Sequence, residues 1–149
     1  MSWESFEGHS LYLDSNIIIL AIESGNRWTE LLRHLFSAIE YRRIRAVASD
    51  LSLAEVLAKP LALGAKDLIA TYERLFAAKS SLITIPISRG VLRLSAELQG
   101  RLNLKLADAI HVATAVTAAC DFFLTNDDRL GKKLTSPRWI SLPEIFPGT

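Results

Sequence analysis

Apolar residues follow two different spacings along this chain, and the two spacings alternate. Short runs rich in β-branched, aromatic and leucine residues predict buried strands. Longer segments, in which apolar residues return every three or four positions, predict helices with a buried face. The predicted strands are residues 11–13, 45–48, 82–87, 122–125 and 139–142. The predicted helices begin at Ser15 and Ser49 and span 28–41, 65–79, 88–102 and 104–119, with a short helical turn at 127–133.

The alternation of strands and helices indicates how these elements pack. Parallel strands need crossover connections, and helices in the crossovers cover both faces of the sheet. We therefore expect an α/β fold, a three-layer α/β/α sandwich around a mainly parallel sheet of four to five strands. Residues 1–149 are expected to form one domain, because no repeat, linker or low-complexity segment interrupts the pattern. Pro60 is expected to end the helix that begins at Ser49, and Pro86 to mark a strand end or a sheet edge.

Composition narrows the classes of protein that fit this pattern. Half of the residues are hydrophobic and 22% are charged, which is typical of a folded globular domain. The apolar stretches are interrupted well before the roughly 18 residues that a membrane span needs, so no membrane partner is expected. The first residues are acidic and lack the basic start of a signal peptide, which favours a cytoplasmic protein. A single cysteine, Cys120, excludes an internal disulfide and a cysteine-based zinc site, and its neighbours predict a small buried side chain.

The net charge of +1 limits how the chain can contact nucleic acid. Proteins that bind nucleic acid through bulk charge have a marked basic excess. Contacts with phosphate must therefore be local or made through a bound metal ion. Residues 41–45 (YRRIR) and the pair Lys132 and Lys133 are the candidate basic patches, with a solvated helix end and a solvated loop as the alternatives.

Three acidic residues stand where predicted strands end or predicted helices begin, which is where open parallel sheets bind ligands. Asp14 follows the first strand, and its alternative role is to cap the helix that begins at Ser15. Glu55 lies near the start of the helix after the second strand, where the alternatives are a capping box with Ser52 or a solvent-facing position. Asp127 follows the fourth strand, where the alternative is an ordinary turn or cap. None of the three indicates a site by itself.

A fourth acidic residue, Asp108, has apolar neighbours on both sides in the predicted helix 104–119. A carboxylate buried there costs on the order of several kcal/mol unless a cation or strong donors compensate it. The alternative, a favourable helix dipole, contributes only about 0.3–1 kcal/mol. If the four carboxylates converge, they repel one another unless a divalent cation lies between them. Oxygen ligands without cysteine select hard ions, so Mg²⁺ or Mn²⁺ is the expected cofactor.

Four segments of the chain resemble the motifs of one nuclease family, the PIN-domain nucleases, and in particular the VapC toxins of toxin–antitoxin pairs. Residues 11–18 (LYLDSNII) are similar to the opening motif, and residues 52–57 (SLAEVL) to the second, which contains a glutamate. Residues 106–115 (LADAIHVATA) resemble the third motif, which is the most specific, and residues 123–127 (FLTND) the last. Their order and separation also match, so the resemblance covers nearly the whole chain.

The resemblance implies cleavage of RNA phosphodiester bonds with Mg²⁺ or Mn²⁺. It also implies a homodimer and a small antitoxin protein whose tail enters the site. By position it gives Asp14, Glu55, Asp108 and Asp127 the metal-binding and catalytic roles, with Asp128 as the alternative for the last. In this hypothesis a water molecule on a metal held by the three aspartates attacks the RNA phosphodiester in line, and Glu55 helps to hold the metals or to orient the water.

Polar residues beside the four acids receive supporting roles from the same resemblance. Ser15 and Asn16 match the polar pair of the first motif, and Thr125 matches the hydroxyl residue ahead of the last acid. They are expected to order the site rather than to take part in the chemistry. His111 lies three residues after Asp108, on the same side of the helix, and is expected to be a hydrogen-bonded, partly buried side chain, with support of the metal-binding acids as the alternative.

The main alternative function is a non-catalytic PIN-like module that binds RNA or a protein partner. Two other α/β classes with acidic sites fit less well. A haloacid-dehalogenase-type phosphatase needs Asp-x-Asp after the first strand, where this chain has Asn16. A phosphoacceptor receiver domain needs an acidic pair near that strand and a lysine after a late one, and neither pattern is present. Nucleotide hydrolysis is not supported either, because no Walker-type glycine loop occurs.

Overall fold

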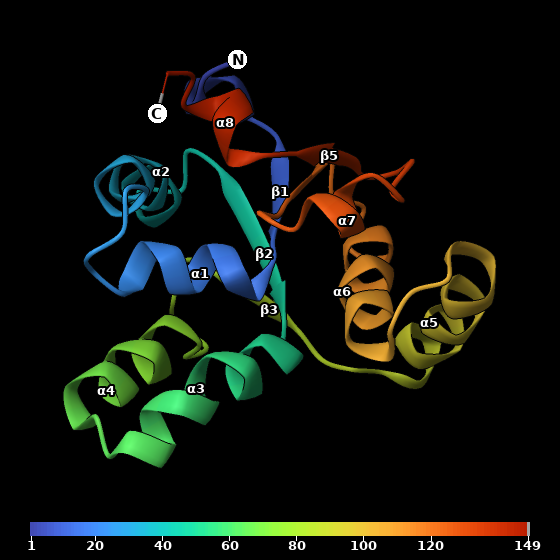
Figure 1. Cartoon of the computed structure of the whole chain (residues 1–149), viewed down its shortest axis with the longest axis horizontal. Coiled ribbons are helices and arrows are strands. Elements are labelled where there is room, and N and C mark those ends of the chain that lie inside the picture. The colour runs from blue at the N-terminus through green and yellow to red at the C-terminus, as the bar shows by residue number, and fades with distance from the viewer. Residues whose placement is uncertain (149) are drawn as a thin grey trace.

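Five short strands form one sheet through the middle of the molecule, in a computed structural model that describes residues 1–148 (Figure 1). They are β1 (Ser10–Leu13), β2 (Arg45–Ser49), β3 (Ile83–Ile85), β4 (Phe122–Leu124) and β5 (Arg138–Ile140). The strand order is β3-β2-β1-β4-β5, and every neighbouring pair is parallel. The predicted fold class is therefore confirmed, with all five strands present and the sheet parallel throughout.

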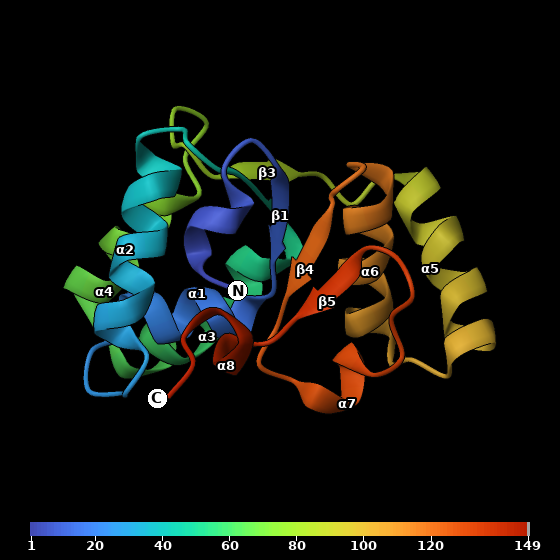
Figure 2. The ribbon, with the colours of Figure 1, turned by 90° about the horizontal axis from the view of Figure 1, so that it is seen from above.

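Helices cover both faces of this sheet. One face is covered by α1 to α4 with α8, and the other by α5, α6 and α7 (Figures 1 and 2). None of the helices in residues 1–148 is long and apolar enough to cross a membrane. The helices are η1 (Trp3–Phe6), α1 (Ser15–Ile22), α2 (Thr29–Glu40), α3 (Leu51–Leu63), α4 (Lys66–Leu75), α5 (Arg89–Leu102), α6 (Leu106–Thr117), α7 (Asp128–Gly131) and α8 (Leu142–Ile145).

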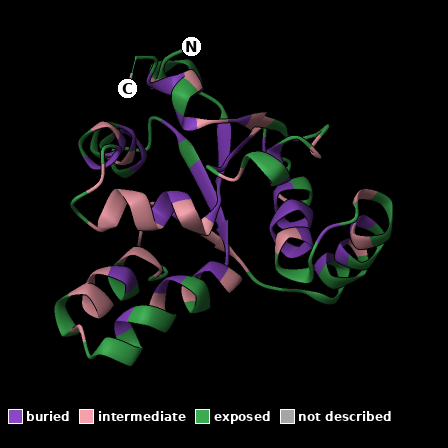
Figure 3. Ribbon diagram, viewed as in Figure 1, coloured by how far each residue is buried: buried purple, intermediate pink, exposed green. Residues whose placement is uncertain are grey.

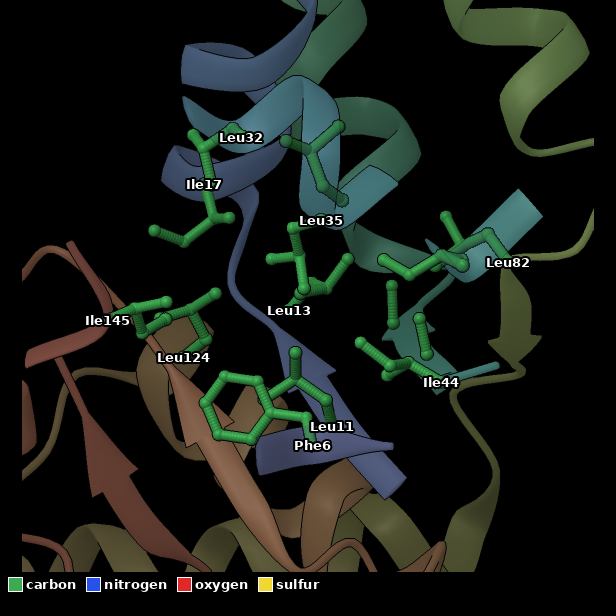
Figure 4. Packing of buried hydrophobic residues seen from close by; sticks show 14 of the residues in the cluster. Phe6, Leu11, Leu13, Ile17, Leu32, Leu35, Ile44, Leu82, Leu124 and Ile145 are labelled. Carbon is green, nitrogen blue, oxygen red and sulfur yellow. The ribbon is translucent and has the colours of Figure 1, made fainter. Parts of the chain in front are cut away.

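The two layers of helices bury two separate hydrophobic cores, one on each face of the sheet. Successive residues of a strand point to opposite faces, so Leu11 and Leu13 enter one core while Tyr12 enters the other. The first core, shown in Figure 4, joins β1 to α1, α2 and α8. The three central strands, β2, β1 and β4, are mostly buried, and exposed residues lie mainly on the outer helices (Figure 3). All four residues of β1 are buried, which is why its sequence is so strongly apolar.

Helix α6 lies between the sheet and α5 and is therefore buried on most sides (Figure 1). Its buried residues run without interruption from Ala109 to Ala115. This position explains the almost wholly apolar sequence of the helix. Asp108 lies at its N-terminal end, in the first turn.

The prediction that α3 ends near Pro60 is wrong. The helix continues to Leu63 and ends at Gly64, whose φ of 65° is the left-handed conformation that favours glycine at a helix end. Proline removes one backbone donor, but Pro60 is buried in the last turn of the helix, where its carbonyl accepts a 3.0 Å hydrogen bond from the N–H of Ala65. The loss of one donor is therefore not enough to end the helix.

Other boundaries follow the sequence more closely. Ser88 caps α5 as predicted, and its side chain accepts a hydrogen bond from the N–H of Val91. Strand β3 lies at the sheet edge, in agreement with its proline. Helix α4 stops at Leu75, four residues before the predicted end at 79. The short helices η1 and α8 were not predicted. Cys120 is buried as expected, and burial raises the pKa of its thiol to about 11.

Candidate functional site

The carboxyl ends of β1, β2 and β4 meet at one edge of the sheet. The parallel register pairs Leu13 with Leu124, so the residues that follow them, Asp14 and Thr125, leave the sheet side by side. The N–H of Asp14 still donates to the carbonyl of Leu124, at 3.1 Å. Helices α1, α3 and α7 begin just beyond this edge. It is the edge at which parallel sheets bind ligands.

Asp14 is the most enclosed of the four predicted acids, with 5% of its surface exposed. One carboxylate oxygen caps α1 by accepting the N–H of Ser15 at 2.9 Å. The other accepts the hydroxyl of Thr125 at 2.7 Å and the side-chain amide of Asn16 at 3.2 Å. The capping role and a role in a site are therefore compatible, because the cap uses only one of the two oxygens.

Asn16 and Thr125 connect the ends of β1 and β4. The side-chain amide of Asn16 donates to the Thr125 hydroxyl oxygen at 3.2 Å, and its carbonyl accepts the N–H of Asn126 at 3.1 Å. The Thr125 oxygen also accepts the N–H of Asp127 at 3.1 Å. A hydroxyl has one proton and two lone pairs, and all three are used here. These bonds hold Asp14 and Asp127 in fixed relation to each other.

His111, from α6, occupies the space between the carboxylates of Glu55 and Asp14. Its Nε2 lies 2.6 Å from Oε1 of Glu55 and 3.8 Å from Oδ1 of Asp14, and its Nδ1 lies 2.6 Å from the hydroxyl of Tyr12. The ring is 1% exposed, more deeply buried than the sequence predicted. Burial lowers the pKa of His111, but the hydrogen bond with Glu55 and the charge of Asp14 outweigh burial, so the pKa is raised.

Glu55 reaches this network from the second turn of α3. The capping box with Ser52 is not formed: Asp50 is the N-cap residue, and the buried Ser52 hydroxyl has no hydrogen-bond partner among the described residues. Partial burial raises the pKa of Glu55, but the hydrogen bond and charge of His111 and the hydroxyl of Ser15 outweigh it, so the pKa is lowered. Glu55 is therefore held as a carboxylate that points into the candidate site.

Asp108 is half-buried and forms no hydrogen bond or ion pair in the part of the chain that the structure describes. Burial raises the pKa of Asp108, and the charges of Asp14 and then Asp127 raise it further, with a smaller contribution from Glu55. The positive charge of His111 opposes them. The structure thus brings the four predicted carboxylates close enough to repel one another.

The sequence left Asp127 and Asp128 as alternatives. Asp127 is half-buried and caps α7, where one of its oxygens accepts the N–H groups of Arg129 and Leu130 at 3.0 and 3.2 Å. Asp128 is exposed. Only Asp127 is among the charges that chiefly raise the pKa of Asp108, which favours Asp127 as the fourth acid.

The four acids suit a divalent cation in their chemistry, although they do not form a finished binding site. Within residues 1–148, no three His, Cys, Asp or Glu side chains are arranged as a complete ligand set. Several of their oxygens already accept hydrogen bonds: His111 engages Glu55, and backbone N–H groups engage one oxygen each of Asp14 and Asp127. A cation would compensate the repulsion at Asp108, and carboxylate oxygens are the ligands that Mg²⁺ and Mn²⁺ prefer. A cavity of about 690 Å³ lies elsewhere, between α2 and α4, and none of the four acids lines it.

Sequence reasoning missed Tyr12, which was interpreted only as part of an apolar strand. Its ring is fully buried and stacks on Phe123, while its hydroxyl bonds His111. One signal was available: a buried tyrosine needs a partner for its hydroxyl, and Tyr12 alternates with Leu11 and Leu13 toward the face that α6 covers.

The family model of the PIN domain matches residues 11–133, which include all four carboxylates and the polar residues that connect them. The comparison with curated proteins finds no match.

Solved structures resemble the chain over most of its length. A toxin–antitoxin complex from Klebsiella pneumoniae is 27% identical, with a TM-score of 0.56, and the match covers 87% of this chain and 99% of the other. VapBC from Salmonella typhimurium, bound to DNA, has a TM-score of 0.71 at 17% identity, with 89% and 98% covered. A VapC toxin from Mycobacterium tuberculosis that cleaves the sarcin-ricin loop has a TM-score of 0.63 at 9% identity, with 76% and 86% covered.

Proposed function

The chain belongs to the PIN domain family, and from this premise we propose that it is a metal-dependent endoribonuclease, the toxin of a VapBC-type toxin–antitoxin pair. The observation on which the proposal rests is Asp108, a half-buried carboxylate whose pKa is raised by burial and by the charges of Asp14, Asp127 and Glu55. Such a concentration of negative charge destabilises a fold unless a cation offsets it. Functional sites commonly tolerate a cost of this kind.

Asp14, Glu55, Asp108 and Asp127 are the residues proposed to hold Mg²⁺ or Mn²⁺. When bound, such an ion lowers the pKa of water and stabilises negative charge on the phosphate that is attacked. Asp108 is free to move toward a cation without losing a hydrogen bond among the described residues. Asp14 and Asp127 each keep one oxygen that no backbone N–H engages.

The surrounding residues are proposed to orient these carboxylates rather than to react. Thr125 and Asn16 hold one oxygen of Asp14 in place, which fixes the direction of the carboxylate. His111 holds Glu55 in the same way from the other side. Because Tyr12 fixes the far nitrogen of His111, the orientation of Glu55 depends on the buried interior of the protein.

Cleavage of a labelled RNA is the direct test of this function. We expect cleavage with Mg²⁺ or Mn²⁺, none with EDTA, and a loss of at least about 100-fold in Asp14→Asn and Asp108→Asn, which remove one carboxylate each. Asp121→Asn is the control, because Asp121 lies at the opposite end of β4. Cleavage that persisted in EDTA and in both variants would refute the proposal. If the chain binds RNA without metal and does not cleave it even when Mg²⁺ or Mn²⁺ is added, the alternative, a non-catalytic PIN-like module, is favoured.

An antitoxin partner and a homodimer are further parts of the proposal. The antitoxin partner is supported by the similar structures, a toxin–antitoxin complex from Klebsiella pneumoniae and VapBC from Salmonella typhimurium, whereas the homodimer rests on the resemblance of the sequence to VapC toxins. If a short gene lies next to the one encoding this chain, its product is expected to copurify with the chain and to suppress RNA cleavage. Light scattering of the purified chain would measure the state of assembly, and a monomer at all concentrations would contradict the homodimer.

A further inference from the structure

A second cavity, of about 290 Å³, adjoins the candidate site between the start of α6 and α7. These two elements lie next to each other in Figure 2. The cavity, called here the α6–α7 pocket, has five polar lining residues: Asn103, Lys105, Asp108, Arg129 and Lys133. Asp108 therefore belongs both to this pocket and to the group of four carboxylates.

Positive charge dominates the lining of the α6–α7 pocket, because three cations surround one carboxylate. Lys105, Arg129 and Lys133 form no ion pair within residues 1–148. Four other arginines of the chain do pair with glutamates: Arg33, Arg43, Arg93 and Arg138. No carboxylate therefore competes with a negatively charged ligand for the cations of the pocket through an ion pair among the described residues.

Lys133 is held toward the pocket by a specific contact. Its ammonium group donates to the backbone carbonyl of Asn103 at 2.8 Å, which joins the segment after α7 to the segment before α6. An ammonium group has three protons, so two remain for a ligand. Because the side chain is already fixed, binding a ligand costs less side-chain entropy than at a mobile surface lysine.

The size and lining of the pocket indicate the kind of ligand. Its volume is at the lower limit of the range of about 300–1,000 Å³ that is typical of small-molecule sites. Lysine and arginine together form strong, charge-assisted hydrogen bonds with phosphate oxygens. We propose that the α6–α7 pocket binds a phosphodiester group of the RNA strand, next to the phosphate that is cleaved. This inference rests on the proposed function, since it assumes that the four carboxylates cleave RNA.

The other basic patch of the sequence is in the wrong place for this role. Arg42, Arg43 and Arg45 lie at the amino-terminal edge of the sheet, near the start of β2, in a cavity shared with Asp121. Arg43 forms an ion pair with Glu7. This patch is at the opposite edge of the sheet from the four carboxylates, so an RNA strand bound there would not enter the site.

The test compares two double variants that remove the same charge at opposite edges of the sheet. The pocket variant carries Lys105→Gln and Arg129→Gln, which remove two exposed cations from the α6–α7 pocket. The matched control carries Arg42→Gln and Arg45→Gln, which remove two exposed cations near the start of β2. The binding of a short fluorescein-labelled single-stranded RNA is measured by anisotropy in EDTA, where metal-dependent cleavage does not occur. The measurement is repeated over a range of salt concentrations.

We expect the pocket variant to bind RNA about tenfold more weakly and the control to bind like the wild type. The slope of log Kd against log salt concentration should fall by about 0.7 for each lost phosphate contact. Equal affinity and slope in the pocket variant and the wild type, with both folded by circular dichroism, would overturn the inference. Equal weakening in both variants would also overturn it, because net charge alone would then explain the binding.

Two further measurements separate this inference from the proposed function and from a site for free phosphate. If wild-type protein cleaves RNA but the pocket variant binds it normally, the pocket assignment fails while the nuclease proposal stands. If the wild type does not cleave RNA but the pocket variant binds it tenfold more weakly, the nuclease proposal fails while the pocket still binds the strand. The binding of inorganic phosphate is the second measurement: if millimolar phosphate binds to the wild type but not to the pocket variant, and does not change the affinity for RNA, the pocket is a site for a free anion and the inference is overturned.

Discussion

At the scale of single residues, the repulsion between neighbouring carboxylates in the candidate site lowers the stability of the metal-free fold. Asp108 has neighbours of like charge and no hydrogen bond among the described residues, so neutralising it should relieve repulsion. We expect Asp108→Asn to raise the melting temperature in EDTA and to abolish the stabilisation that Mg²⁺ or Mn²⁺ gives the wild type. Asp128→Asn, an exposed neighbour of the site, is the control and should behave like the wild type.

Differential scanning fluorimetry with and without metal would measure both effects of this substitution. A lower melting temperature of Asp108→Asn in EDTA would contradict the interpretation, because it would mean that the carboxylate stabilises the metal-free fold. Metal stabilisation that disappeared in Asp128→Asn would instead identify Asp128 as the fourth acid.

The hydroxyl of Tyr12 is the second test at this scale. Tyr12→Phe removes the partner of the buried Nδ1 of His111 while keeping the ring that packs on Phe123. A buried polar atom without a partner costs about 1–3 kcal/mol, so we expect the free energy of unfolding to fall by that amount in urea. Tyr41→Phe is the matched control: Tyr41 is 76% exposed and its change should stay within about 0.5 kcal/mol. Equal stability of the two variants would show that the hydrogen bond contributes nothing.

Sequence reasoning identified acids more easily than their partners. Asp14 directly follows a strand and Asp108 lies in an apolar helix, so the pattern of the sequence draws attention to both, whereas Glu55 and Asp127 depended more on the resemblance to a family. The bond between Tyr12 and His111 joins residues 99 positions apart and depends on which face of β1 α6 covers. No local spacing contains that information.

At the scale of the elements, most helices were predictable from the three- to four-residue spacing of their apolar positions, and the strands from their short apolar runs. The exceptions have local causes. Helix α3 passes Pro60 because the missing donor falls in its last turn, and the helix then ends at Gly64. The four-residue helices η1 and α8 are too short to show a periodicity. Helix α8 is stabilised instead by a capping box between Ser141 and Glu144.

Helix α7 offers a test of packing beside the site. A Cβ added to Gly131 would lie 2.1 Å from the ring of Trp139, which also donates a hydrogen bond to the carbonyl of Thr125. Gly131→Ala must therefore displace the ring, and we expect a loss of about 1–3 kcal/mol of stability in urea. Gly100→Ala, inside α5 with open space around the new Cβ, should stabilise the protein by up to about 1 kcal/mol. Shifts of the same sign in both variants would contradict this account.

At the scale of the whole molecule, the near-neutral net charge conceals an uneven distribution. The total of +1 gave no reason to expect nucleic-acid binding. The fold nevertheless gathers unpaired cations at the edge where the four carboxylates lie, and it separates them from the arginines near the start of β2. The direction of the strands therefore determines whether a basic patch lies at the same edge of the sheet as the four carboxylates. The net charge of the chain gives no information about this.

The stability of the whole molecule should fall in alkali, because several buried groups keep their protons in the folded state. Burial raises the pKa of Cys120 from 9.0 to about 11, and burial also raises the pKa values of Tyr12 and Tyr72. The unfolded chain releases these protons at lower pH than the folded chain, so the free energy of unfolding decreases as the pH rises from about 9 toward 11. Urea titrations across this range should show a shallower decline in Cys120→Ala than in the wild type, since that variant lacks the thiol. Parallel declines would mean that Cys120 ionises equally in both states, and rapid labelling of the native thiol at pH 8 would lead to the same conclusion.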